Sequence, residues 1–175
     1  MEDVDEVTAA ALRARRGDEA SASQFVRATQ ADVWRLCANL GARAAAEDLT
    51  QETYARAFAS LHRFAGRSSA RTWLLAIARR VCADAVRDAV RVRSVPPDRS
   101  NSAADPADSV TVRALLDTLD PERREAFVLT QLVGLSYAET ADVCGCPVGT
   151  VRSRVARARA DLVAGFGRGS ARAAR

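Results

Sequence analysis

The sequence predicts an all-α protein of two small helical domains, an N-terminal helical bundle and a C-terminal helix-turn-helix domain, joined by a flexible linker. Three observations support this fold class. The apolar residues are mainly Ala, Leu and Val with few aromatic residues, a composition that favours helices over sheets. These apolar residues recur at the spacing of amphipathic helices. One segment, residues 94–109, is instead rich in proline and polar residues, and it divides the chain in two.

The N-terminal domain, residues 1–93, is expected to contain four helices. Apolar residues at helical spacing place these helices near residues 7–16, 20–40, 44–61 and from residue 69 onwards. Gly41 is a natural end for the second helix. The fourth helix follows a short break, and its apolar face carries Leu74, Ile77, Val81 and Ala85.

The linker at residues 94–109 reads SVPPDRSNSAADPADS and holds three of the five prolines. It has almost no large apolar residue, so it cannot bury enough surface to offset the entropy of ordering. Residues 110–166 form the C-terminal domain, in which Asp120 is expected to cap a helix that has Pro121 at its first position. Residues 167–175, rich in Gly, Ala and Arg, are expected to be a disordered tail.

The charge of the chain points to a nucleic-acid partner. The formal net charge is +4, the sequence pI is about 9.3, and all 26 basic residues are Arg. Arg binds phosphates and guanines through two parallel hydrogen bonds, which fits a nucleic-acid partner. A GC-rich genome, whose codons favour Arg and Ala, is an alternative explanation of the high Arg content. The last thirty residues carry seven arginines against a single acidic residue, Asp161, so the C-terminal end has the charge distribution of a DNA-binding surface.

No enzyme, metal site or membrane protein is indicated. The chain has one His, no metal-ligand spacing, no phosphate-binding loop and no nucleophile motif, so we expect no catalytic residue, metal or cofactor. Cys37 and Cys82 fit small core positions, while Cys144 and Cys146 have poor spacing for zinc. The absence of a signal peptide and of a long apolar run predicts a cytoplasmic protein without a membrane partner.

The strongest motif is a helix-turn-helix at residues 136–162. Ser136 and Glu139 fit a capping box, Ala141 supplies a small side chain where two helices approach, and Gly145 suits the tight turn. On the second helix the apolar stripe consists of Val151, Val155, Ala158 and Leu162. The polar residues off this stripe are Thr150, Arg152, Ser153, Arg154 and Arg157. A recognition helix uses such positions in the major groove, and the alternative is a solvated basic helix.

A second motif lies on the predicted third helix. At 100 degrees per residue, Asp48, Gln51 and Glu52 project to one side of this helix. The residues expected on the other side are Thr50, Thr53, Ala57 and Leu61. An acidic patch away from the basic surfaces of a DNA-binding protein fits a protein partner. A plain solvated face is the alternative.

A third motif combines a polar loop with the fourth helix. The loop supplies Arg67, Ser68 and Ser69, and Arg71 and Trp73 follow. The exposed stripe of the helix is predicted to consist of Arg80, Asp84, Arg87 and Arg91. Basic side chains beside an aromatic residue can hold single-stranded DNA. In the alternative interpretation Trp73 is a core residue and the arginines are solvated.

Together the three motifs resemble the extracytoplasmic-function (ECF) subfamily of bacterial sigma factors, within the sigma-70 family. The matching segments read AEDLTQETYARAF at 46–58, SARTWLLAIARR at 69–80 and GLSYAETADVCGCPVGTVRSRVARARADL at 134–162. They occur in the order of the family, on both sides of a linker typical of it. The resemblance covers about residues 7–162, nearly the whole chain.

The resemblance implies an alternative sigma factor that recruits core RNA polymerase to promoters. Asp48, Gln51 and Glu52 match the segment that docks on the clamp helices of the largest polymerase subunit. Residues 66–91 match the part that melts and reads the −10 element, and the helix-turn-helix matches the reader of the −35 element. The family often has Asn where Arg80 stands, a difference that concerns the −10 preference, whereas Asp84 matches a common Asp.

Further partners implied by the resemblance are promoter DNA, the flap of the second-largest polymerase subunit and, as in many members, an anti-sigma factor. The free protein is expected to be a monomer without a cofactor. The competing interpretation is a helix-turn-helix transcriptional regulator that acts without being a polymerase subunit. Such a regulator would dimerise and bind duplex DNA alone, and it would not need the acidic face or the long polar linker.

Overall fold

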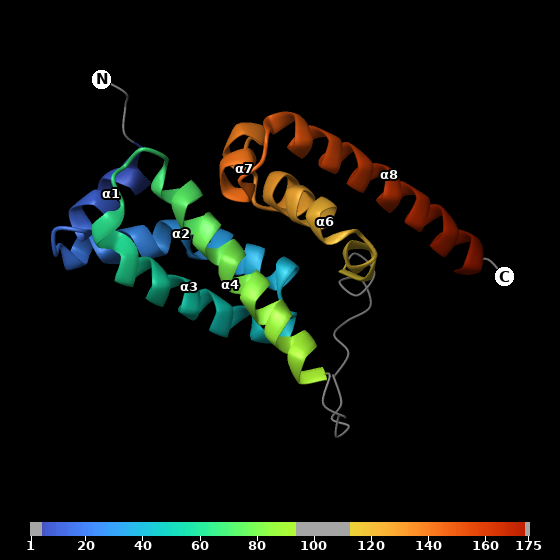
Figure 1. Cartoon of the computed structure of the whole chain (residues 1–175), viewed down its shortest axis with the longest axis horizontal. Coiled ribbons are helices and arrows are strands. Elements are labelled where there is room, and N and C mark those ends of the chain that lie inside the picture. Colours follow the sequence, from blue (N-terminus) through green and yellow to red (C-terminus); the bar gives the residue numbers. More distant parts are fainter. Residues whose placement is uncertain (1–4, 94–112, 174–175) are drawn as a thin grey trace.

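The computed structural model describes residues 5–93 and 113–173, and every regular element in these two ranges is a helix (Figure 1). The predicted all-α fold class is therefore confirmed. The predicted linker at 94–109 lies outside the described residues.

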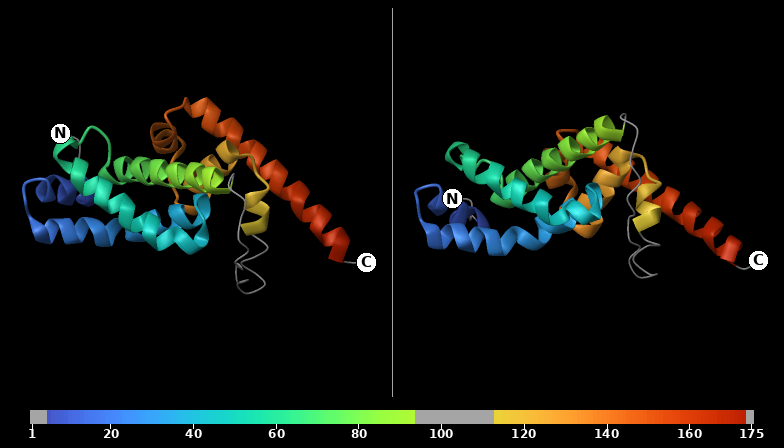
Figure 2. Two further views of the ribbon diagram at one scale, coloured as in Figure 1. Left: turned by 60° about the horizontal axis from the view of Figure 1, so that its bottom comes forward. Right: turned by 90° about the horizontal axis from the view of Figure 1, so that it is seen from below.

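The N-terminal half contains four α-helices at the positions expected from apolar spacing. They are α1 (Glu6–Ala14), α2 (Glu19–Leu40), α3 (Ala46–Ser60) and α4 (Ala70–Arg93), and the short 3-10 turns Arg43–Ala45 and Leu61–Arg63 flank α3. Asp5 and Asp18 accept hydrogen bonds from the backbone amides of Thr8 and Ala20, at 2.9 and 3.0 Å, and so cap α1 and α2. In all three ribbon views α2 and α3 run side by side, and α4 packs against both (Figures 1 and 2).

The C-terminal half begins with helices that were expected and ends with one longer than expected. After a helical segment at residues 113–117 come α6 (Pro121–Phe127), a π-helical turn at Val128–Leu132, α7 (Tyr137–Cys144) and α8 (Val148–Ala173). Asp120 caps α6 by accepting from the amide of Glu122 at 3.0 Å, as predicted. α8 continues through residues 167–173, which belong to the segment predicted as a disordered tail. Extending a helix that already exists is far easier than nucleating a new one.

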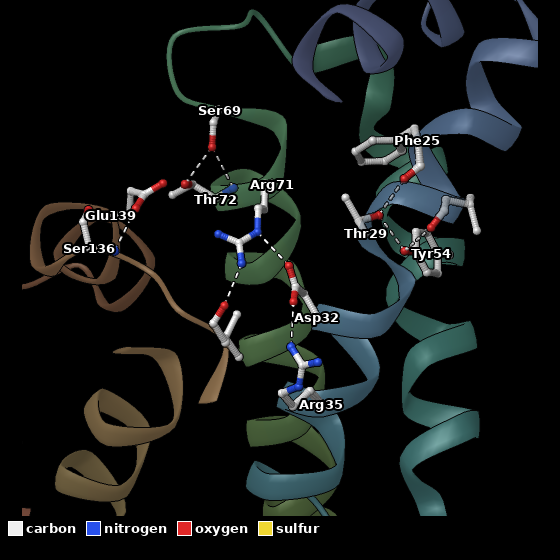
Figure 3. Close-up of polar contacts among 12 residues, drawn as sticks. Phe25, Thr29, Asp32, Arg35, Tyr54, Ser69, Arg71, Thr72, Ser136 and Glu139 are labelled. Carbon is white, nitrogen blue, oxygen red and sulfur yellow. Dashed lines mark hydrogen bonds and ion pairs between the residues drawn. The ribbon is translucent and has the colours of Figure 1, made fainter. Parts of the chain in front are cut away.

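The helix-turn-helix has the local geometry that its sequence predicts. The side chain of Ser136 accepts from the amide of Glu139 at 3.1 Å, and the Glu139 carboxylate accepts from the amide of Ser136 at 2.8 Å (Figure 3). Gly145 ends α7 with φ 65° and ψ 39°, a left-handed conformation that favours glycine. This turn directs the chain into α8.

The two halves pack against each other, which the sequence did not predict. Phe25, Leu36 and Leu74 of the N-terminal half share one apolar cluster with Val128, Leu129, Val133, Leu135 and Val143 of the C-terminal half. Smaller clusters then hold α8 on the helices of its own half through Val151, Val155 and Ala158. One continuous core therefore sets the relative positions of α3, α4 and the first helices of the C-terminal half, and the smaller clusters place α8 on those helices.

Polar contacts at the end of α2 reinforce this packing. The last turn of α2 has no basic residue of its own. Arg113 donates to the backbone carbonyls of Ala38 and Gly41, and Arg124 donates to the carbonyl of Asn39. Burial lowers the pKa of Arg124, although its guanidinium pairs with the nearby Asp117 carboxylate at 2.6 Å. The C-terminal half therefore caps a helix of the N-terminal half.

We predict opposite effects of alanine at two glycines near the turn. Gly145→Ala should lower the free energy of unfolding by about 1–2 kcal/mol, because a side chain disfavours the left-handed conformation. Gly149→Ala is the matched control, since Gly149 lies in the first turn of α8 with nothing within 4 Å of an added Cβ. It should raise stability by about 0.5 kcal/mol. Urea unfolding monitored by circular dichroism measures both, and equal effects would contradict the turn assignment.

Candidate functional site

The exposed face of α3 has the form predicted from its sequence. Asp48, Gln51 and Glu52 are all exposed. The residues turned to the core are Leu49, Thr50, Thr53, Ala57 and, just after the helix, Leu61. The hydroxyls of both buried threonines donate to carbonyls of their own helix at 2.7 Å, so no polar group there requires water. An acidic, solvated surface thus lies on a rigid, well-packed helix.

Two shallow hollows adjoin this acidic face in the seam between α2 and α3, and the sequence reasoning did not assign them. One, of about 330 Å³, is lined by Val26, Gln30, Thr50, Gln51 and Tyr54. The other, of about 410 Å³, is lined by Ala22, Ser23, Val26, Arg27 and Phe58. Phe58 is 39% exposed. Its helical spacing from Tyr54 and Gln51 places it on the same side of the third helix, and this spacing could have identified it from the sequence.

Tyr54 is held firmly beside these hollows. Its hydroxyl lies 2.7 Å from the hydroxyl of Thr29, which in turn donates to the carbonyl of Phe25 at 2.7 Å (Figure 3). Burial raises the pKa of the Tyr54 hydroxyl. A neutral, half-buried tyrosine next to carboxylates gives this surface an apolar component as well as a charged one.

A chain of ion pairs connects α3 with α4. Arg56 pairs with Glu52 of its own helix and with Asp84 of α4, both at 2.7 Å. Asp84 also pairs with Arg87. The Arg56 guanidinium lowers the pKa of the Asp84 carboxyl. Asp84 is therefore ionised and charge-compensated rather than a bare carboxylate on the helix surface.

The rest of the predicted stripe on α4 is open to solvent. Arg80, Arg87 and Arg91 are exposed, and Arg91 lies 3.9 Å from Asp88 in a loose, exposed pair. Arg79, on the flank, is instead engaged by Glu125 of α6 at 2.5 Å. The exposed arginines can neutralise phosphates because nothing in the described structure covers them.

The loop before α4 divides into exposed and structural residues. Arg67 and Ser68 are exposed, as a DNA contact requires. Ser69 is half-buried and caps α4 by accepting from the amide of Thr72 at 3.1 Å. Trp73 packs on Phe64 with ring centroids 4.9 Å apart, which supports the core interpretation of this residue.

Arg71 lies between the two halves of the molecule rather than on an open surface. It pairs with the Asp32 carboxylate at 2.7 Å and donates to the carbonyl of Val133 at 2.7 Å (Figure 3). Asp32 also binds Arg35 at 3.0 Å. Arg71 is thus only 28% exposed, and in this arrangement it joins α2, α4 and the segment before α7.

The recognition helix presents most of its predicted residues outwards. Arg152, Ser153 and Arg157 are exposed, and Thr150 is half-buried. Arg154 differs, because its guanidinium pairs with Glu122 of α6 and lies 3.6 Å from the sulfur of Cys146. Its side chain is only 19% exposed. Arg154 therefore fixes α8 on α6, and the sequence period alone did not separate it from its exposed neighbours.

The described residues contain no group of three or more His, Cys, Asp or Glu side chains placed to hold a metal ion. Cys37 and Cys82 are buried core residues, as predicted. Burial raises the pKa of Cys144 to about 12, which disfavours its thiolate form. None of the helices within the described ranges is long and apolar enough to cross a membrane.

The sequence of this chain matches known protein families and characterised relatives along most of its length. The chain matches the families "Sigma-70 region 2" over residues 25–92 and "Sigma-70, region 4" over residues 109–162. It is 50% identical to the ECF RNA polymerase sigma factor SigC of Mycobacterium tuberculosis, over 93% of this chain and 92% of that protein. It is 35% identical to the ECF sigma factor SigE of Mycolicibacterium smegmatis, over 93% and 69%.

Solved structures show the same fold. CnrH in complex with the cytosolic domain of CnrY matches with a TM-score of 0.77 and 28% identity, covering 93% of this chain and 98% of that one. The sigma factor RpoE of Bartonella quintana, in complex with the anti-sigma factor NepR, matches with a TM-score of 0.71 and 30% identity, covering 80% and 92%. The chain belongs to the ECF subfamily of the sigma-70 factors of bacterial RNA polymerase.

Proposed function

We propose that this sigma factor docks on core RNA polymerase through α3 and contacts the two promoter elements through α4 and α8. As an ECF member it is an alternative sigma factor, and it directs promoter-specific initiation rather than catalysing a reaction. The main support for assigning different partners to these helices is that their charged surfaces are separate. One acidic face and two arginine-bearing faces lie on three different helices, of which α3 and α4 pack in the main core and α8 in the smaller clusters beside it.

For polymerase docking, we propose that Asp48, Gln51 and Glu52 meet the clamp helices of the largest subunit. Their exposure supports this role, and the adjoining hollows beside Tyr54 and Phe58 can accept apolar side chains from the same partner. Mixed apolar and charged contacts are typical of protein interfaces. The flap of the second-largest subunit is proposed as the partner of the C-terminal domain, residues 110–166.

For the −10 element, we propose contacts from the N-terminal domain, residues 1–93. Among the predicted residues, the exposed ones are Arg67, Ser68, Arg80, Arg87 and Arg91, and these are proposed as direct contacts. Ser69 and Trp73 are proposed to shape the site, because they cap and support the start of α4. Arg71 would contact DNA only after its bond to the carbonyl of Val133 is broken.

For the −35 element, we propose that Arg152, Ser153 and Arg157 enter the major groove, with Thr150 near the backbone. Their exposure near the start of α8 supports this, since side chains there reach base edges in helix-turn-helix proteins. Arg154 is assigned a positioning role through Glu122.

An anti-sigma factor is proposed as a further partner. Two solved neighbours of this fold were captured with the cytosolic domain of CnrY and with the anti-sigma factor NepR. The protein is proposed to act as a monomer in the cytoplasm, where polymerase and promoters are found. Neither a metal nor a cofactor is required for the proposed contacts.

The central test is transcription in vitro with purified core polymerase. Core plus this protein should produce transcripts from specific start sites on genomic templates, and core alone should not. The protein without core should show little specific binding to the same promoters. Promoter-specific binding by a dimer without core would instead favour an ordinary helix-turn-helix regulator.

The docking surface is tested by charge reversal. Asp48→Arg should weaken binding to core polymerase by more than about tenfold, because a like-charge contact across an interface costs several kcal/mol. Asp88→Arg on the exposed side of α4 makes the same charge change away from the proposed docking face and should bind core normally. Fluorescence titration of labelled variants with core measures both. Normal affinity of Asp48→Arg would show that this face is only solvated.

The recognition helix is tested by truncating its arginines. Arg152→Ala and Arg157→Ala should each lose about 1–3 kcal/mol of discrimination at particular upstream base pairs. Arg154→Ala should instead weaken all upstream sequences alike, because this residue acts through the placement of α8. Transcription from a library of upstream sequences measures the preference. A uniform loss for Arg152→Ala and Arg157→Ala would assign them to phosphate contacts.

A further inference from the structure

We propose that Arg56 is a positioning residue for reading the −10 element, although it lies on the docking helix α3. It would act by holding the carboxylate of Asp84 in place on the DNA-facing stripe of α4. The inference rests on the proposed function of α4 as the reader of the −10 element. Arg56 lies outside the surfaces predicted from the sequence.

The geometry of Arg56 is defined by two carboxylates on two helices. Its Nε donates to Glu52, one turn earlier on α3, at 2.7 Å. Its Nη1 donates to Oδ2 of Asp84, twenty-eight residues later on α4, at 2.7 Å. A planar guanidinium bound at two of its nitrogens has little freedom to rotate. The hydrogen bond to Glu52 therefore orients the guanidinium of Arg56 towards Asp84.

Asp84 is surrounded by donors on both of its oxygens. Arg56 binds Oδ2, and Arg87 binds Oδ1 from one turn further along α4. Its pKa is lowered chiefly by the hydrogen bond from Arg56, so the carboxylate is ionised and can only accept. A carboxylate has about four lone-pair sites, and two arginine donors leave capacity for another donor.

This arrangement solves an electrostatic problem for a DNA-reading helix. A bare carboxylate among phosphates would be repelled, whereas two flanking guanidinium groups compensate its charge. Asp accepts hydrogen bonds from the exocyclic amine of cytosine, a contact that distinguishes base pairs. Arg56 therefore allows Asp84 to approach a base without facing DNA itself.

The same contacts connect the proposed docking face of α3 with the proposed DNA-reading stripe of α4 through the guanidinium of Arg56. Glu52 belongs to the proposed docking face, and it shares Arg56 with Asp84 of the proposed DNA stripe. If a basic group of the polymerase pairs with Glu52, Arg56 loses one of its two carboxylate partners. Asp84 is the partner that remains. Polymerase binding would then strengthen the positioning of Asp84 at the moment when promoter reading begins.

The test is a double-mutant cycle in transcription with full-length protein and core polymerase. Arg56→Gln, Asp84→Asn and the double variant are assayed at saturating protein, so that altered docking does not contribute. The templates carry each possible base pair at every −10 position. Asp88→Asn is the matched control, because Asp88 is an exposed carboxylate one turn further on α4 with only a loose pair to Arg91. Arg56→Lys tests rescue by a shorter cation.

We expect Arg56→Gln and Asp84→Asn each to reduce transcription about tenfold, the size of one lost charge-assisted hydrogen bond. Both should relax preference at the same base position, and the double variant should be no worse than either. Arg56→Lys should retain part of the preference, and Asp88→Asn should behave like the wild type. Thermal unfolding should show that all variants fold.

Additive losses in the cycle would overturn the proposal, as would a loss in Arg56→Gln that leaves base preference unchanged. Arg80→Ala separates this from failure of the proposed function. If Arg80→Ala alters −10 preference while Arg56 and Asp84 are uncoupled, only the role of Arg56 fails. If none of these variants alters −10 preference, the assignment of α4 as the −10 reader fails.

Discussion

The apolar packing around α2 is the interaction on which the rest of the molecule depends. Phe25, Val33 and Leu36 are fully buried, and α2 contacts α1, α3, α4 and the π-helical turn of the C-terminal half. Because these contacts form one core, α3 and α4 have fixed positions relative to the first helices of the C-terminal half. Each functional surface is the outer side of a helix whose inner side packs in this core or in the smaller clusters beside it.

Much of this organisation could be predicted from the sequence. Helical spacing located all four N-terminal helices, and Ser136, Glu139 and Gly145 defined the helix-turn-helix because capping and left-handed turns depend on local residues. The exposed side of α3 followed from its period in the same way. The packing of the two halves could not be predicted, since apolar residues such as Val128 and Val143 fit a core without revealing which helices complete it.

Arginine is the residue type for which sequence reasoning separated roles least well. Arg71 and Arg154 stood among the predicted DNA contacts, yet their guanidinium groups are bound by Asp32 and by Glu122 in the structure. Arg152 and Arg157, at neighbouring positions, are exposed. A chain without Lys uses Arg both to hold helices together and to present charge, and only the position of the partner carboxylate distinguishes the two uses.

The capping of α2 by the other half contributes less to the junction between the halves than its contact geometry suggests. The carbonyls of Ala38, Asn39 and Gly41 receive donors from Arg113 and Arg124, and water can supply equivalent donors at an open helix end. Separation also restores the hydration that burial withholds from Arg124. The polar part of this junction is therefore an exchange of one set of hydrogen bonds for another. The apolar cluster that both halves share, rather than these hydrogen bonds, therefore holds the two halves together.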